Sequence, residues 1–323
     1  MKWELSAGAD FEFTSAVCSH GFFMLAPNRW DPASRTLRTV VALDDEHAAD
    51  VVLSASPRGV RVEAPVRAAD RAAITRAVSR MLRLDEDLAP FHVLCRASTT
   101  HAGAAEARFG RLLRSATLFE DVVKVICTCN IAWRQTTAIV RKLVEVWGVP
   151  APSGARAFPT PRRLAEVSMQ ALRDVARLGY RAPFVHRLAH DVVSGALDLV
   201  ALETFAGSSS ELHKALRRIH GIGDYAAGNL CMLLGRYDHL AVDTEMIRFL
   251  RERHPRRRFT PAAIRRYFAR WAPWQFLAYW YELWSGYTAE HGDAREWSPE
   301  GVGARITESP KLAEAGSSMK RKI

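Results

Sequence analysis

The pattern of apolar and polar positions divides the chain near residue 67. Before that point, β-branched and aromatic runs alternate with turn-forming stretches that contain Pro, Gly, Asn and Asp. Runs of this kind predict strands, and they occupy residues 21–26, 36–43, 51–56 and 59–64. The last two runs are joined by Pro57-Arg58-Gly59, which predicts a β-hairpin. The N-terminal segment is therefore expected to form a small sheet.

Apolar residues repeat with helical spacing through most of the remaining chain. Helix starts are marked at Thr160-Pro161 and Thr260-Pro261, where a hydroxyl can cap the helix and a proline takes its first position. Another helix is expected to stop at Gly148, with Pro150 just beyond it. A strand-rich beginning followed by a long helical body predicts an α+β fold.

We divide the chain into a sheet-containing domain at 1–112, a helical domain at 113–293 and a loose basic tail at 294–323, where the periodicity ends. A chain of 323 residues with 48% apolar residues can fold as two or three domains. No run approaches eighteen apolar residues, and the N-terminus has no signal-peptide pattern. The protein is expected not to be secreted and not to span a membrane. We expect it in the cytoplasm or nucleoid, or in a eukaryotic nucleus, for which the terminal "MKRK" is a short candidate address.

Cysteine and histidine spacing predicts no metal site built from side chains. The five cysteines stand at positions 18, 95, 127, 129 and 231, an odd number that suggests reduced thiols. No four-cysteine spacing for zinc or an iron–sulfur cluster occurs. His186 and His190 are four residues apart but lack the glutamate of a zinc-protease motif, so a solvated pair is expected.

The net charge of +10 and the sequence pI near 9.7 favour a polyanionic partner. Arginine outnumbers lysine, and the guanidinium group matches phosphate geometry. Arg251, Arg253 and residues 256–258 form a basic stretch. This stretch is either a solvated loop or a phosphate contact.

Residues 221–226 read "GIGDYA" and are followed by Asp243, which matches the letters of a dinucleotide-binding turn. Such a turn requires a strand before its glycines. Here the preceding apolar positions are 212, 215, 216 and 219, and the following ones are 227, 230, 231 and 234. Both sets have helical spacing, so the unit is predicted to be helix, hairpin, helix. A dinucleotide-dependent oxidoreductase is the least favoured interpretation.

The hairpin residues Gly221, Ile222, Gly223 and Asp224 are candidates for binding DNA. Glycine permits positive φ and lets the backbone approach a ligand closely. The N–H groups at the start of the second helix then form an anion site suited to a backbone phosphate. An ordinary helix–helix turn with a glycine cap is the alternative.

Residues 216–249, together with "GRLLRSATLFEDVVKVICTCNIAWRQTTAIVRKL" and the "LGYRA" stretch upstream, resemble the helix-hairpin-helix (HhH-GPD) DNA glycosylases. The similarity covers about residues 10–290 and involves the 8-oxoguanine and 3-methyladenine glycosylase branches. It implies a small antiparallel N-terminal sheet, a helical core and a monomer that repairs damaged bases in double-stranded DNA. It implies no cofactor apart from a possible monovalent cation held by hairpin carbonyls.

The resemblance also implies roles for single residues. Asp243 matches the catalytic aspartate, although it could instead cap the next helix. Tyr225 stands where glycosylases that also cut the strand carry a lysine for a Schiff base. Lys124, Lys142 and Lys214 have no motif to recommend them. The resemblance therefore favours a monofunctional enzyme acting on a damaged purine, with an alkylated purine favoured and an oxidised one also possible. A non-catalytic DNA-binding protein and a glycosylase/lyase with another lysine are the alternatives.

Asn130, Tyr180 and Arg181 match family positions that wedge into the duplex or hold the base left unpaired when the damaged base is flipped out. The alternatives are a buried helical amide for Asn130 and a helix-end turn for Gly179-Tyr180. In the aromatic segment 271–287, the residues Trp274, Tyr279 and Trp280 are candidates for the lesion pocket. An aromatic helix is more often part of the core.

Overall fold

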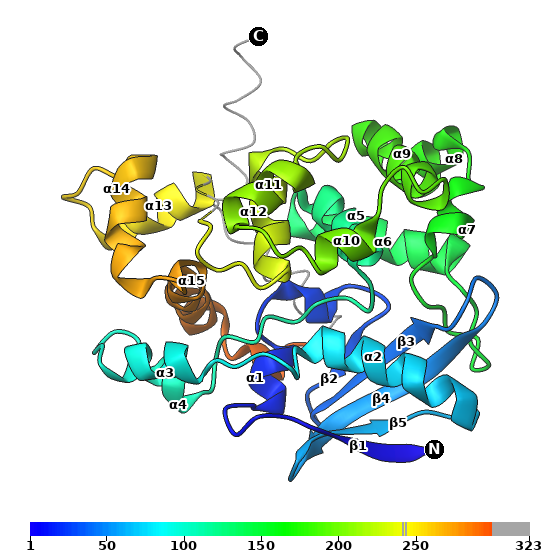
Figure 1. Cartoon of the computed structure of the whole chain (residues 1–323), viewed down its shortest axis with the longest axis horizontal. Helices are drawn as coiled ribbons and strands as arrows, with labels where there is room; N and C mark the ends of the chain where they lie inside the picture. The colour runs from blue at the N-terminus through cyan, green and yellow to red at the C-terminus, as the bar shows by residue number, and fades with distance from the viewer. Residues whose placement is uncertain (241, 243, 299–323) are drawn as a thin grey trace.

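The computed structural model describes residues 1–240, 242 and 244–298 (Figure 1). Its strands form one antiparallel sheet in the order β1-β5-β4-β3-β2. Residues Ser56 and Gly59 pair across the β4–β5 turn, so the predicted hairpin is confirmed. The strand bounds are β1 (Lys2–Ser6), β2 (Arg29–Asp31), β3 (Thr36–Ala42), β4 (Ala48–Ser56) and β5 (Gly59–Glu63).

One predicted strand is wrong. Residues 21–26 begin with the 3₁₀ helix η1 (Gly21–Met24), because Phe22, Phe23 and Met24 are all buried and a strand on a half-covered sheet would alternate inside and outside. Strand β2 lies instead within the stretch expected to be a turn. The remaining three predicted strands are present as β3, β4 and β5.

Helices fill most of the described chain after the sheet. The predicted caps are confirmed: Thr160 accepts from the Arg163 N–H, and Thr260 accepts from the Ala263 N–H. The α-helices are α1 (Phe13–Val17), α2 (Arg71–Leu82), α3 (Ala89–Arg96), α4 (Ala102–Glu106), α5 (Leu118–Thr128), α6 (Trp133–Trp147), α7 (Pro161–Ala165), α8 (Met169–Asp174), α9 (Ala182–Val193), α10 (Leu199–Glu203), α11 (Ser209–Leu216), α12 (Asp224–Leu233), α13 (Thr244–Arg253), α14 (Pro261–Phe268) and α15 (Gln275–His291). The 3₁₀ helices after η1 are η2 (Ala68–Asp70), η3 (Gly179–Arg181), η4 (Ala269–Trp271) and η5 (Ala294–Glu296).

Helix α2 crosses the sheet (Figure 1), and the Trp3 indole on β1 donates to the Thr75 hydroxyl on α2 at 3.1 Å. A continuous hydrophobic core joins the sheet to the helical part, from Trp3 to Trp297. The tail predicted from residue 294 is therefore not loose over its first five residues. Trp297 is 5% exposed, and the Trp30 indole donates to the Arg295 carbonyl at 2.8 Å. The rest of that tail, 299–323, lies outside the described residues.

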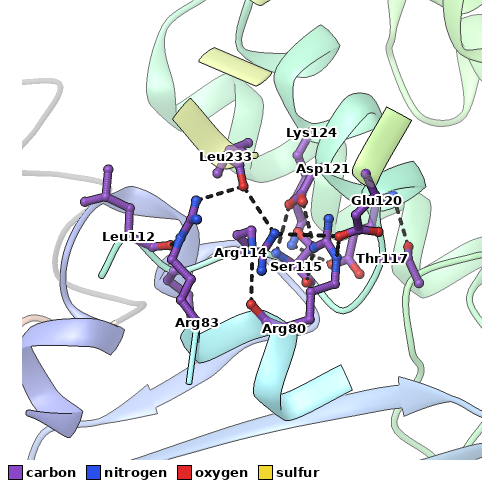
Figure 2. Close-up of polar contacts among 12 residues, drawn as sticks. Arg80, Arg83, Leu112, Arg114, Ser115, Thr117, Glu120, Asp121, Lys124 and Leu233 are labelled. Carbon is purple, nitrogen blue, oxygen red and sulfur yellow. Dashed lines mark hydrogen bonds and ion pairs between the residues drawn. The ribbon is translucent and has the colours of Figure 1, made fainter. Parts of the chain in front are cut away.

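A buried polar cluster also ties the sheet-side helix α2 to the helical part (Figure 2). The Arg80 guanidinium donates to the Asp121 carboxylate at 2.8 Å. The Arg83 guanidinium donates to the Leu112 and Leu233 carbonyls, each at 2.7 Å. Because these contacts reach α5 and the end of α12, they fix the relative positions of both helices and α2. Within the described ranges, no helix is long and apolar enough to cross a membrane.

Candidate active site

The predicted helix-hairpin-helix unit is present as α11, a turn and α12. Helix α11 begins with a capping box between Ser208 and Glu211. The apolar side chains of Leu212, Leu216 and Ile219 are buried, as their helical spacing predicted. These side chains hold α11 against the core and leave the turn at the surface.

The two hairpin glycines have different environments. Gly221 has φ +87°, and a Cβ built on it would lie 2.3 Å from Cγ of Phe184. Gly223 has φ −88°, which any residue adopts, and a Cβ there would meet nothing within 4 Å. Gly221 is therefore required by the fold. No neighbour within the described chain requires Gly223, which leaves its backbone open to a ligand.

Helix α12 begins at the hairpin without a side-chain cap, since Gly223 is its N-cap. The first N–H groups of a helix have no partner within that helix, and the helix dipole adds positive potential there. Asp224 is 76% exposed and is held by Arg217 at 3.2 Å. Ile222, by contrast, is 5% exposed, so it anchors the hairpin in the core and cannot reach a ligand.

A cavity of about 740 Å³ brings the hairpin together with two segments far from it in sequence. Seven of the candidate residues line it: Asn130, Tyr180, Arg181, Gly221, Gly223, Asp224 and Tyr225. Sequence patterns did not point to the other lining residues, which are Ile126, Thr128, Cys129, Ile131, Phe184, Ala226 and Val242. Of these, only Phe184 could have been suspected, as an aromatic residue close after the "LGYRA" stretch.

Asn130 lies between α5 and α6, with φ +51°, and its side chain is exposed. It is therefore not a buried helical amide. Its side-chain amide lies 3.5 Å from the Tyr180 hydroxyl, and that hydroxyl also donates to the Cys129 carbonyl at 3.3 Å. The left-handed backbone at Asn130 directs this short turn into the cavity.

The Arg181 guanidinium holds the turn at Cys129 and Asn130 through hydrogen bonds to its carbonyls. Its Nε donates to the Cys129 carbonyl at 3.1 Å, and its Nη2 donates to the Cys129 and Asn130 carbonyls. The side chain also lies over the Tyr180 ring, with Cζ 4.4 Å from the ring centroid. Arg181 is only 5% exposed. In this structure it positions Asn130 and Tyr180, which are the two residues that face outward.

Tyr225 is 42% exposed and stands on the first turn of α12. None of the described residues that line the cavity is a lysine. Lys124 is fully buried and paired with Glu120 at 2.6 Å, and Lys142 is paired with Glu145 on the surface of α6. The site thus offers an aromatic ring and no described amine.

Asp243 lies outside the described residues. Its neighbour Val242 lines the cavity, and α13 begins at Thr244. The chain therefore passes the cavity immediately before the predicted catalytic position.

The aromatic candidates of the C-terminal helix do not line this cavity. Tyr279 is buried against Phe249 and Phe268, and Trp274 packs on Phe91. The Trp280 indole donates to the Ser19 carbonyl at 2.9 Å. Their role in a lesion pocket stays a prediction.

Within the described part of the chain, no group of three or more His, Cys, Asp or Glu side chains could hold a metal ion. His186 and His190 do meet on α9, with their Nε2 atoms 3.3 Å apart. Burial and the neighbouring His190 lower the pKa of His186.

The sequence pattern of the HhH-GPD superfamily of base excision DNA repair proteins matches residues 123–273. The matched segment is just under half of the chain, and over this segment the resemblance inferred from the sequence is confirmed.

Among known proteins, the chain is similar to DNA-3-methyladenine glycosylase 2 of Escherichia coli K12, with 27% identity over 168 residues. The aligned part is 50% of this chain and 57% of that protein, so the match spans just over half the length of this relative.

Two solved structures share the fold. A 3-methyladenine DNA-glycosylase from Archaeoglobus fulgidus superposes with a TM-score of 0.68 at 18% identity, covering 89% of this chain and 98% of that chain. A Clostridium acetobutylicum 8-oxoguanine glycosylase/lyase, in complex with double-stranded DNA containing cytosine opposite 8-oxoguanine, gives 0.68 at 16% identity, covering 88% and 93%. The predicted α+β fold is confirmed. Both likenesses concern the fold alone.

Proposed function

We propose that this protein is a monofunctional DNA glycosylase of base excision repair, which flips a damaged purine out of duplex DNA and hydrolyses its N-glycosidic bond. The observation that carries the proposal is the cavity beside the hairpin. There, an open helix N-terminus, an aromatic ring and the Asn130–Tyr180 pair meet next to Val242, one residue before Asp243. Each of these groups has a distinct task in removing a base.

The hairpin supplies the grip on the DNA backbone. A phosphate can approach Gly223, where no side chain intervenes, and accept from the first N–H groups of α12. Hairpin carbonyls could also hold a monovalent cation against the same phosphate. Ile222 and the packing of Gly221 on Phe184 keep this loop in place.

Asp243 is assigned to the chemical step. As the bond between the sugar and the base breaks, the base leaves with the bonding electrons and the sugar becomes oxocarbenium-like. A carboxylate stabilises that positive charge and can accept a proton from the attacking water. The water oxygen then bonds to C1′, which gives a free base and an abasic site.

The monofunctional assignment rests on Tyr225. A lyase requires an amine that attacks C1′ and forms a Schiff base, and a phenol cannot form one. The described residues around the cavity provide no lysine, and Lys124 is buried in its pair with Glu120.

Asn130 and Tyr180 are assigned to stabilise the gap and the unpaired base that remain in the duplex after the damaged base is flipped out. Both residues line the cavity, Asn130 from the turn that Arg181 holds and Tyr180 from η3. An amide can pair with an exposed base edge and a ring can insert between base steps. An electron-poor alkylated purine is favoured as substrate, since an aromatic ring such as Tyr225 attracts a cationic base. The similarity to an E. coli 3-methyladenine glycosylase supports the same choice, with oxidised purines second.

The test offers the protein duplexes carrying 3-methyladenine, hypoxanthine, 8-oxoguanine or uracil, with and without borohydride. The protein, Asp243→Asn and the control Asp174→Asn, an exposed acid on α8, are compared for base release. The proposal expects purine release by the parent and the control, a loss of at least about 100-fold in Asp243→Asn, and no trapped adduct.

Two outcomes would contradict the proposal. A borohydride-trapped adduct would show a lyase that uses an amine elsewhere. Tight duplex binding with no release of any purine would show a DNA-binding protein without this catalytic activity.

A further inference from the structure

The positive charge of the protein is concentrated in one segment. Residues 244–271 contain nine arginines and two glutamates, against a net charge of +10 for the whole chain. Seven of these arginines are exposed and have no carboxylate within 4 Å in the described part of the chain. One of the seven, Arg270, lies over the Trp271 ring. We call the other six the arginine platform: Arg251, Arg256, Arg257, Arg258, Arg265 and Arg266.

A small aromatic cluster anchors the loop that carries three of the platform arginines, Arg256, Arg257 and Arg258. In the loop between α13 and α14, the His254 Nε2 lies 3.1 Å from the Tyr267 hydroxyl, and the ring of Phe259 packs edge-on against Tyr267. Phe259 is 5% exposed, and the Arg257 N–H donates to the His254 carbonyl at 2.9 Å. Anchored backbone of this kind lowers the entropy cost when arginines bind a ligand.

The platform segment directly follows the cavity-lining residue Val242 along the chain. In Figure 1, α13 lies between α14 and the α11–α12 unit, and α13 starts two residues after Val242, which lines the cavity. Shortly before Val242 in the chain, His239 stacks on His213 of α11 with ring centroids 4.2 Å apart. His213 in turn lies 3.9 Å from the Asp224 carboxylate.

An electrostatic interaction links one platform arginine to a histidine that is packed on α11. Burial lowers the pKa of His239, and His213 and Arg265 of the platform lower it further. Arg265 is thus close enough to His239, which stacks on His213 of α11, to disfavour its protonation.

We propose that the arginine platform is a second phosphate-binding surface, which grips one arm of the same duplex whose backbone the hairpin holds. This inference rests on the proposed function only in taking duplex DNA as the ligand. Unpaired guanidinium groups favour phosphate oxygens as partners. Helix α13 has ten residues, about 15 Å of rise. At 3.4 Å per base pair, the platform reaches a position about four or five base pairs from the cavity.

The test compares Arg256→Gln/Arg257→Gln/Arg258→Gln with a matched control on the sheet, Arg29→Gln/Arg38→Gln/Arg58→Gln. Both sets are exposed, and both remove three charges. Affinity for an undamaged duplex is measured between about 50 and 200 mM salt, where the logarithmic slope falls by about one for each phosphate that the protein no longer neutralises. The slope is expected to fall by about two to three in the platform variant and by less than about one in the control.

A second measurement locates the platform on the duplex. Each arm of a lesion duplex is shortened in turn to about three base pairs, which is too short to reach the platform at 3.4 Å per base pair. The parent is expected to bind more weakly when one particular arm is shortened, and the affinity of the platform variant is expected to stay the same. Equal thermal unfolding of both variants and the parent checks the fold.

An unchanged salt slope in the platform variant, or an equal fall in the control, would overturn the inference. So would a fall in affinity on shortening that is the same in parent and variant. Failure of the proposed function can be told apart from failure of this inference. If the parent releases no base but the platform variant shows the smaller salt slope, the platform proposal stands and the glycosylase proposal fails. If the parent releases a base and the platform variant has an unchanged salt slope, the glycosylase proposal stands and the platform proposal fails.

Discussion

Two glycines in the hairpin show how one residue type serves two purposes. Gly221 has φ +87° and no room for a Cβ beside Phe184. Gly223 has an ordinary backbone conformation and open space where a side chain would be. The first is a requirement of folding, and the second leaves access for a partner.

This difference predicts opposite effects of alanine at the two positions. Gly223→Ala should change the free energy of unfolding by no more than about 1 kcal/mol while weakening duplex binding, because its methyl group meets the phosphate. Gly221→Ala should destabilise the protein by about 2 kcal/mol or more, from positive φ and the clash with Phe184. Denaturant unfolding and duplex affinity, measured on both variants, check this. If Gly223→Ala bound the duplex as tightly as the parent, the hairpin would not be a phosphate-binding site.

At the scale of residues, the sequence predicted which positions share the cavity better than it predicted how each is used. Asn130, Tyr180 and the hairpin glycines do meet there. Arg181 was predicted to touch DNA, yet its guanidinium donates to the Cys129 and Asn130 carbonyls. A motif does not indicate which way a guanidinium turns, since that depends on backbone carbonyls brought close only by folding.

Among the elements, α2 and α5 are joined by charges that water barely reaches. Asp121 is fully buried and accepts from Arg80 and from the Ser115 N–H, each at 2.8 Å. Burial alone would raise the pKa of Asp121, but Arg80 and the Ser115 hydrogen bonds bring it below the ordinary value. Burial lowers the pKa of Arg114 to about 10, helped by Arg83 and Arg80. In this cluster (Figure 2), Asp121 is the fully buried carboxylate paired with Arg80. Glu203, which pairs with Arg80 and Arg114, is more exposed.

Removing the Asp121 carboxylate should be costly. Asp121→Asn removes the fully buried partner of Arg80 and leaves it paired with the more exposed Glu203, which should destabilise the protein by about 3 kcal/mol or more. The control is Glu145→Gln, which breaks exposed pairs with Arg141 and Lys142 and should cost less than about 1 kcal/mol. Urea unfolding of both variants at neutral pH provides the comparison, and equal destabilisation would mean that the cluster adds no special stability.

Helix ends and the hairpin were predictable because their signals are local. Thr160 and Thr260 cap helices through hydroxyls within three residues. The failures were non-local: residues 22–24 are buried on every side by parts of the chain distant in sequence, and Trp297 returns to pack on Phe23. A composition that predicts a strand or a loose tail does not reveal a distant partner that buries it.

Over the whole molecule, the sheet-containing part and the helical part share one core, and His20 lies where they meet. It is buried, its Nε2 donates to the Leu113 carbonyl at 2.6 Å, and its ring meets Trp280 of α15 edge-on. Burial lowers the pKa of His20 to about 4, despite the opposing hydrogen bond to Leu113. The folded protein therefore keeps this imidazole neutral at pH values where an unfolded chain would protonate it.

The sign of the resulting pH dependence follows from the order of protonation. The ordinary pKa of 6.5 applies to the unfolded chain, so the contribution of His20 to stability is fully present above pH 6.5. It is lost as the pH falls from 6.5 to about 4, by up to about 1.4 kcal/mol per pH unit. His20→Gln, whose amide can still donate to Leu113, should lower stability at pH 7 but flatten its decline towards pH 5. The exposed His47→Gln should leave the slope unchanged, and part of the slope should survive in both variants because burial also lowers the pKa of His101 to about 4. Urea unfolding at pH 7, 6 and 5 measures these slopes. If the free energy of unfolding fell as steeply in His20→Gln as in the parent, His20 would not be the source of this acid sensitivity.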